Sequence, residues 1–163
     1  MVKESDILEP IGRIIIPGSE ERFIVQDKFV VDRTGEAQVS IHTIGQNFEK
    51  WFLKSIELPT SEITVEYLLF LSKFDDRKIL DLAKGNITVT VGHIYRLLEQ
   101  QGRGQAGCLA VNGQTNIFYA LDKEGLKRAI RVRWYAGWIV VANEVDGMTV
   151  HNVKSQLFRR LAA

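Results

Sequence analysis

The chain has 163 residues, of which 45% are hydrophobic and 25% charged, and its formal net charge is +1. These values are typical of one globular domain and exclude a disordered chain or a fibrous repeat. No apolar run approaches the roughly 20 residues that span a bilayer, and the first residues contain no apolar signal segment. We therefore expect a cytoplasmic protein without a membrane partner.

Strand signals dominate residues 1–58, which are expected to form an acidic lobe rich in β-structure. The β-branched run 11–16 ends at a Pro-Gly turn pair, a pattern that predicts a strand. Residues 39–43 alternate apolar and polar side chains and are expected to pair in a β-hairpin. A short helix is predicted over 47–54, because its aromatic residues share one stripe.

Helical spacing follows in residues 59–163, which are expected to form a basic α+β lobe. The spacing of apolar residues predicts helices within 65–72, from Asp75 to Leu82, and after Thr90. Asp75 and Thr90 are suitable N-caps for the last two. The acidic and basic lobes are expected to pack together as one compact domain.

The last third of the chain predicts an antiparallel β-meander of four strands. The first two, 108–111 and 116–121, meet around an Asn-Gly pair, which favours a hairpin, and strands 127–135 and 138–145 follow. From residue 150 onward the apolar spacing fits a terminal amphipathic helix. The predicted fold class is therefore α+β, with N-terminal β-hairpins, central short helices, a C-terminal antiparallel meander and a terminal helix.

Charge is divided unevenly along the chain. Residues 1–82 carry 10 Lys or Arg and 15 Asp or Glu, whereas residues 83–163 carry 11 and 5. Such asymmetry can mark a surface for an anionic partner. It is equally expected where an acidic and a basic lobe complement each other within one fold.

A basic and aromatic face is predicted on strand 127–135. Alternation places Lys127, Arg131, Arg133 and Tyr135 on one side, and a two-residue loop at 136–137 would bring Trp138 opposite Tyr135. A bulged loop would shift this register. Guanidinium groups bind phosphate and carboxylate, and aromatic rings stack on bases. These five residues are the candidate binding site. The alternative is a half-solvated sheet on which aromatic rings pack against arginine stems.

No catalytic or metal-binding motif is recognised. The G-x-G-x-x-G run at 102–107 follows a predicted helix and precedes a strand, the reverse of a dinucleotide-binding loop. His42, His93 and His151 lie far apart, and the sequence does not decide whether they converge. Cys108 is the only cysteine, so it forms no internal disulfide, and whether its thiol is reactive stays open. No cofactor or metal is expected.

The run that begins at Asn116 and includes Asp122, Gly125, Arg128-Ala129 and Gly137-Trp138 resembles a pattern of small uncharacterised bacterial proteins. The resemblance covers about the last third of the chain. It implies a cytoplasmic bacterial origin and assigns no function to any residue.

The leading functional hypothesis is a non-enzymatic binding domain whose C-terminal sheet face contacts a protein or an anionic ligand. A second hypothesis is nucleic-acid binding, through that face or through the helix region bearing Arg96 and Arg103. A third is a small hydrolase or ribonuclease that uses a histidine with Arg131 or Arg133. Self-association is a further expectation, because exposed Trp and Tyr are common in interfaces.

Overall fold

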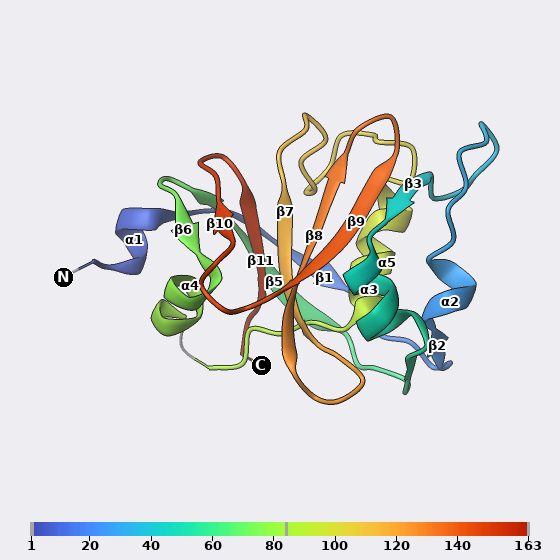
Figure 1. Cartoon of the computed structure of the whole chain (residues 1–163), viewed down its shortest axis with the longest axis horizontal. Helices are drawn as coiled ribbons and strands as arrows, with labels where there is room; N and C mark the ends of the chain where they lie inside the picture. Colours follow the sequence, from blue (N-terminus) through green and yellow to red (C-terminus); the bar gives the residue numbers. More distant parts are fainter. Residues whose placement is uncertain (1, 84, 163) are drawn as a thin grey trace.

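A computed structural model of the chain describes residues 2–83 and 85–162. Its largest element is a seven-stranded mixed sheet with the order β1-β5-β11-β7-β8-β9-β3 (Figure 1). The strands of this sheet are β1 (Leu8–Ile16), β3 (Ile41–Ile44), β5 (Ile63–Phe70), β7 (Asn116–Leu121), β8 (Lys127–Trp134), β9 (Trp138–Glu144) and β11 (Gln156–Arg160). Two short antiparallel pairs accompany it, β2 (Phe23–Ile24) with β4 (Ile56–Glu57) and β6 (Phe74–Asp75) with β10 (Val150–His151).

The helices are short, and together with the sheets they make the fold α+β. They are α1 (Glu4–Ile7), α2 (Val25–Lys28), α3 (Gln46–Phe48), the π-helical segment η1 (Glu49–Leu53), α4 (Asp76–Leu82) and α5 (Val91–Gln100). Both predicted N-caps are confirmed, because Asp75 accepts from the Lys78 amide of α4 and Thr90 from the His93 amide of α5. Among the described residues no helix is long and apolar enough to cross a bilayer.

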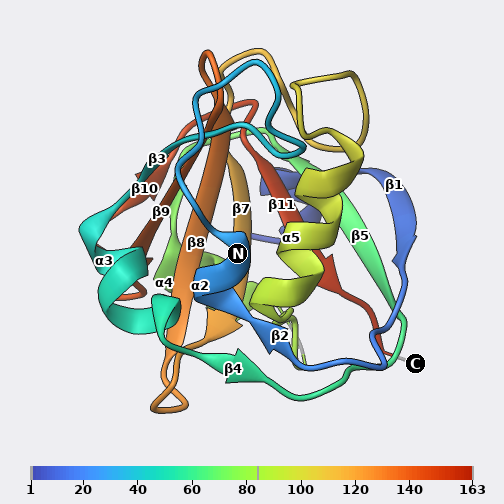
Figure 2. The same ribbon diagram turned by 90° about the vertical axis from the view of Figure 1, so that its right-hand side faces the viewer.

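Helices cover both faces of the main sheet. On the α5 face, helices α2, α3 and α5 pack on a large apolar cluster that includes Val132, Val140 and Trp138. On the α4 face, α4 packs on a smaller cluster that includes Tyr119 and Ala129. In Figure 2, α2 and α5 lie in the foreground and α4 lies behind β8. The two faces of β8 are therefore covered by different parts of the chain.

The N-terminal hairpins predicted from the sequence do not form. Strand β1 pairs with β5 in an antiparallel manner, and β3 pairs with β9 in a parallel manner. The helix predicted within 65–72 is also wrong, because this segment belongs to β5. β5 is an inner strand with buried residues on both faces, and this double burial removes the alternation by which a strand is recognised.

The prediction of a terminal helix is likewise wrong. Residues 156–160 form β11, which lies between β5 and β7, with buried Leu157 on the α4 face and buried Phe158 on the α5 face. Adjacent apolar residues in such a strand imitate helical spacing. The meander consists of β7, β8 and β9, which pair in order in an antiparallel manner, whereas residues 108–111 are not a strand.

The glycine-rich run 102–107 is a loop after α5, as the sequence predicts. A side chain at Gly102 would meet the Gln38 carbonyl oxygen at 1.9 Å, and one at Gly104 would meet the Trp134 ring at 2.4 Å. Gly104 also has a φ of +73°, which favours glycine. These glycines therefore have a packing role.

Strands from both expected lobes share the main sheet. β1 and β3 come from residues 1–58, and the other five strands come from residues 59–163.

Candidate functional site

The α4 face of β7, β8 and β9 carries three rows of side chains, each running across the strands. The first row contains Thr115, Arg133 and Ile139, the second Ile117, Arg131 and Val141, and the third Tyr119, Ala129 and Asn143. The third row is buried, whereas Arg133 in the first row is exposed. Helix α4 and strand β10 therefore cover the third row of this face, and the region that they cover ends near the second row.

A cavity of about 270 Å³ lies on this face where the cover ends. It is lined by two arginines of β8, two aliphatic residues of β9 and the threonine that precedes β7: Arg131, Arg133, Ile139, Val141 and Thr115. In the antiparallel register, Arg131 lies opposite Val141 and Arg133 opposite Ile139. The cavity thus has a cationic side along β8 and an apolar side along β9.

Neither arginine of the cavity forms an ion pair with a described carboxylate. Arg131 is half-buried, and its Nε atom is buried without a hydrogen-bond partner. Burial lowers the pKa of Arg131; the Asp76 carboxylate opposes this shift and Arg133 adds to it. Since a guanidinium stays charged at neutral pH, the cavity holds a partly desolvated cation beside a second one.

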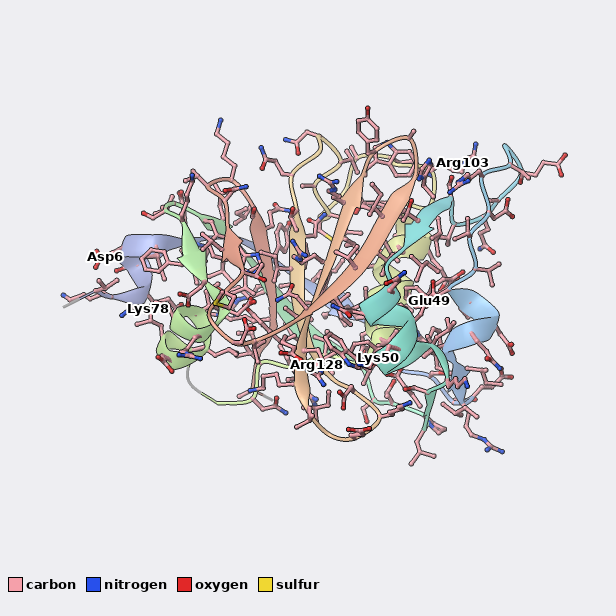
Figure 3. The ribbon with its side chains drawn as sticks, viewed as in Figure 1. Asp6, Glu49, Lys50, Lys78, Arg103 and Arg128 are labelled. Atoms are coloured by element: carbon pink, nitrogen blue, oxygen red, sulfur yellow. The ribbon has the colours of Figure 1, made fainter. Side chains whose placement is uncertain are left out.

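Two other arginines, Arg128 and Arg159, have clear carboxylate partners. Arg128, labelled in Figure 3, lies on the opposite face of β8 by alternation. It places its Nε 2.9 Å from an Asp122 carboxylate oxygen and its guanidinium carbon 3.8 Å from the centroid of the Trp51 ring. Arg159 pairs with Glu4 at 2.7 Å and with Glu66 at 3.1 Å. Arg131 and Arg133 differ from these two arginines because neither has a carboxylate partner among the described residues.

A buried polar network supports the third row. The carboxylate of Asp76, which is fully buried, accepts from the Tyr119 hydroxyl at 2.6 Å, from Asn143 Nδ2 at 2.9 Å and from His151 Nε2. Burial, with the Asp76 charge and hydrogen bond, raises the pKa of Tyr119 well above its usual value, so the hydroxyl stays a donor. The network links α4 and β10 to the sheet, and so fixes where the covered part of the α4 face ends.

The predicted five-residue face is only partly formed. Tyr135 is 72% exposed in the turn after β8. Lys127 lies on the same side of β8 but at its other end, and buried Ala129 stands between it and Arg131. Of the predicted residues, the cavity brings together Arg131 and Arg133.

Trp138 does not belong to that face, because the predicted register is wrong. The turn contains three residues, Tyr135 to Gly137, so Trp134 lies opposite Trp138. Both rings are on the α5 face, where Trp138 is fully buried. Ala136 takes a φ of 57°, a conformation that a β-carbon disfavours, and this unusual turn moves every β9 side chain to the face opposite the predicted one.

The histidines do not converge. His42 contacts Thr43, His93 contacts Thr90 at the start of α5, and His151 contacts Asp76. Burial lowers the pKa of His93. No group of three or more potential metal ligands is found in the part of the chain that the structure describes.

Cys108 is half-buried rather than freely accessible. Burial raises the pKa of its thiol, which disfavours the reactive thiolate.

The two arginines of the helix region are held by the backbone. Arg96 donates to the Pro17 and Gly18 carbonyls. Arg103 donates to the Ala37 carbonyl at 3.1 Å, beside the loop that leads to β3 (Figure 3). Both side chains thus have a structural role in fixing these loops.

Sequence reasoning missed the apolar half of the cavity and the network behind it. Ile139 and Val141 alternate with the buried residues of β9, so the correct register would have found them. Asp76 and His151 are 75 positions apart, and nothing in their local sequence indicates that they meet. Comparison of the chain with protein-family models, curated proteins and solved structures finds no match.

Proposed function

We propose that the protein is a non-enzymatic binding module that holds an anionic ligand between Arg131 and Arg133 on the α4 face. The observation that carries the proposal is the pair of arginines without a described ion-pair partner in one cavity. Since they are two positions apart on β8, their β-carbons are separated by about 6.6 Å. Both guanidinium groups can therefore donate to one phosphate or carboxylate group.

Binding is favoured over catalysis by the composition of the cavity. None of the histidines lines it, and Nε2 of His151, the histidine of the α4 face, is bonded to buried Asp76. General acid–base chemistry needs a titratable group within reach of the ligand. The cavity residues supply donors and apolar surface instead.

A single nucleic-acid strand is a less favoured ligand. Stacking platforms need aromatic rings along the groove, and Trp138 is buried on the other side of the sheet. Tyr135 is left as the exposed aromatic side chain of the predicted face.

Titration of the ¹⁵N-labelled protein with inorganic phosphate at low ionic strength tests the proposal. We expect shifts at the amides of the cavity, with affinity lowered about tenfold or more in Arg131→Gln and in Arg133→Gln, since charge-assisted hydrogen bonds are each worth about 1.5–3 kcal/mol. Arg22→Gln is the control, because it makes the same charge change outside the cavity. Absence of binding by inorganic phosphate and by small carboxylates titrated in the same way, or an equal loss in all three variants, would refute the proposal.

A single-stranded oligonucleotide is titrated in parallel. Affinity that is stronger than that of phosphate, and falls much more steeply with salt, would replace the small-anion proposal with nucleic-acid binding.

A further inference from the structure

We infer that the ligand is a small organic anion with a short aliphatic chain, its charged head on β8 and its chain on Ile139 and Val141. This inference rests on the function proposed above and names the class of ligand. It follows from the apolar wall of the cavity, which a bare inorganic anion would leave unused.

The two sides of the cavity lie in a fixed relation. Each arginine of β8 is directly opposite an aliphatic residue of β9, Arg133 opposite Ile139 and Arg131 opposite Val141. Opposite β-carbons in an antiparallel pair are about 4.5–5.5 Å apart. A molecule lying across the two strands would thus meet guanidinium groups at one end and branched aliphatic side chains at the other. Thr115, on the β7 side, adds a hydroxyl group to the polar end.

Ile139 and Val141 do not belong to either hydrophobic cluster of the described residues. Both are only half-buried, although their neighbours Trp138 and Val140 are fully buried on the other face. These two side chains therefore contribute little to the hydrophobic core of the fold. β-Branched residues have few rotamers, so the wall they form is stiff before a ligand arrives.

The size of the cavity agrees with this assignment. Its volume of about 270 Å³ is far more than the roughly 10–15 Å³ that holds one water molecule. It lies just below the range of about 300–1,000 Å³ that holds drug-sized ligands. A head group with a chain of a few carbon atoms fills this space better than an inorganic ion does.

The inference is tested with two series of ligands at constant ionic strength, measured by calorimetry or NMR titration. One series is inorganic phosphate with methyl, ethyl and butyl phosphate, and the other is acetate, butyrate and hexanoate. We expect affinity to rise by up to about fourfold for each methylene group that reaches the wall, and then to level off. A rise in either series supports the inference, and the series with the tighter members identifies the head group.

Two variants show where the aliphatic part of the ligand lies; Val141→Thr nearly keeps the shape of the side chain, and Ile139→Thr shortens it by one carbon atom. Val141→Thr and Ile139→Thr place a hydroxyl group in the wall, and we expect them to remove most of the dependence on chain length. The readout in each variant is the ratio of its affinities for butyl phosphate and inorganic phosphate, so a change in the affinity for the bare ion cancels. Ile15→Thr is the control, because Ile15 is 58% exposed on β1 outside the cavity, and it should behave as the parent does.

The possible failures are distinguishable. If inorganic phosphate binds through Arg131 and Arg133 but chain length has no effect, or the threonine variants retain the full effect, the inference is overturned and the proposed function stands. If neither the inorganic ion nor any member of the two series binds, the proposed function is overturned, and the inference with it.

Discussion

Removal of a single hydroxyl group from Tyr119 tests the stabilising role of the buried network. This hydroxyl donates to the Asp76 carboxylate at 2.6 Å, and both residues are fully buried. Tyr119→Phe deletes the oxygen and keeps the ring, which packs in the cluster under α4. The change therefore isolates one hydrogen bond to a buried charge.

The expected loss follows from the partners that remain. A hydrogen bond to a charged group contributes about 1.5–3 kcal/mol, and a buried carboxylate that loses a donor pays an additional desolvation cost. The oxygen that Tyr119 contacts still accepts from His151, and the other oxygen accepts from Asn143. Each oxygen of the Asp76 carboxylate thus keeps a hydrogen-bond donor, and we expect the free energy of unfolding to fall by about 2 kcal/mol.

Urea unfolding at neutral pH, followed by tryptophan fluorescence, measures this difference. Tyr135→Phe is the matched control, because the Tyr135 side chain is 72% exposed and forms no hydrogen bond within the described chain. Its effect should lie within about 0.5 kcal/mol of zero. If Tyr119→Phe is as stable as Tyr135→Phe, the network does not hold α4 and β10 on the sheet.

Two further predictions concern stability. Gly104→Ala should destabilise the protein by about 2–5 kcal/mol in chemical denaturation, since it combines a positive φ with a clash against the Trp134 ring. Gly113 also has a positive φ but faces open space, so Gly113→Ala should cost only about 1–2 kcal/mol. Equal costs for the two variants would contradict the packing role of Gly104. Burial raises the pKa of Glu57 above its usual value, so the folded protein retains a proton that the unfolded chain releases. The stability of the parent relative to Glu57→Gln should therefore decrease as the pH rises from about 4.5 through the raised pKa of the folded state, and a constant difference between pH 4 and pH 7 would contradict this.

Local features of the fold were predictable where the signal is confined to a few neighbouring residues. The caps at Asp75 and Thr90 belong to this group, because one side chain satisfies an amide three positions away. The glycine loop after α5 was predictable for the same reason. The hairpin between β8 and β9 was located correctly, but its register was not, since the strained backbone at Ala136 is permitted only by the surrounding structure.

The partners of the strands could not be predicted in this way. β11 enters the sheet between β5 and β7, and its two neighbours come from distant parts of the chain. No local pattern reports such a pairing, because the free energy that favours it comes from burial on both faces of the sheet. The same limit explains why the contact between Asp76 and His151 was missed.

The net charge of +1 and the split between an acidic and a basic half are properties of the sequence alone, and alternation on β8 is enough to place Arg131 and Arg133 on one face. Which arginines have partners within the fold is decided by the tertiary structure. The side chains of four of them bind carbonyl or carboxylate groups from other segments of the chain: Arg96, Arg103, Arg128 and Arg159. The fold likewise decides that Trp138 is buried and that Ile139 and Val141 face the arginines. The sequence supplies the cations, and packing determines which two of them share a cavity with an apolar wall.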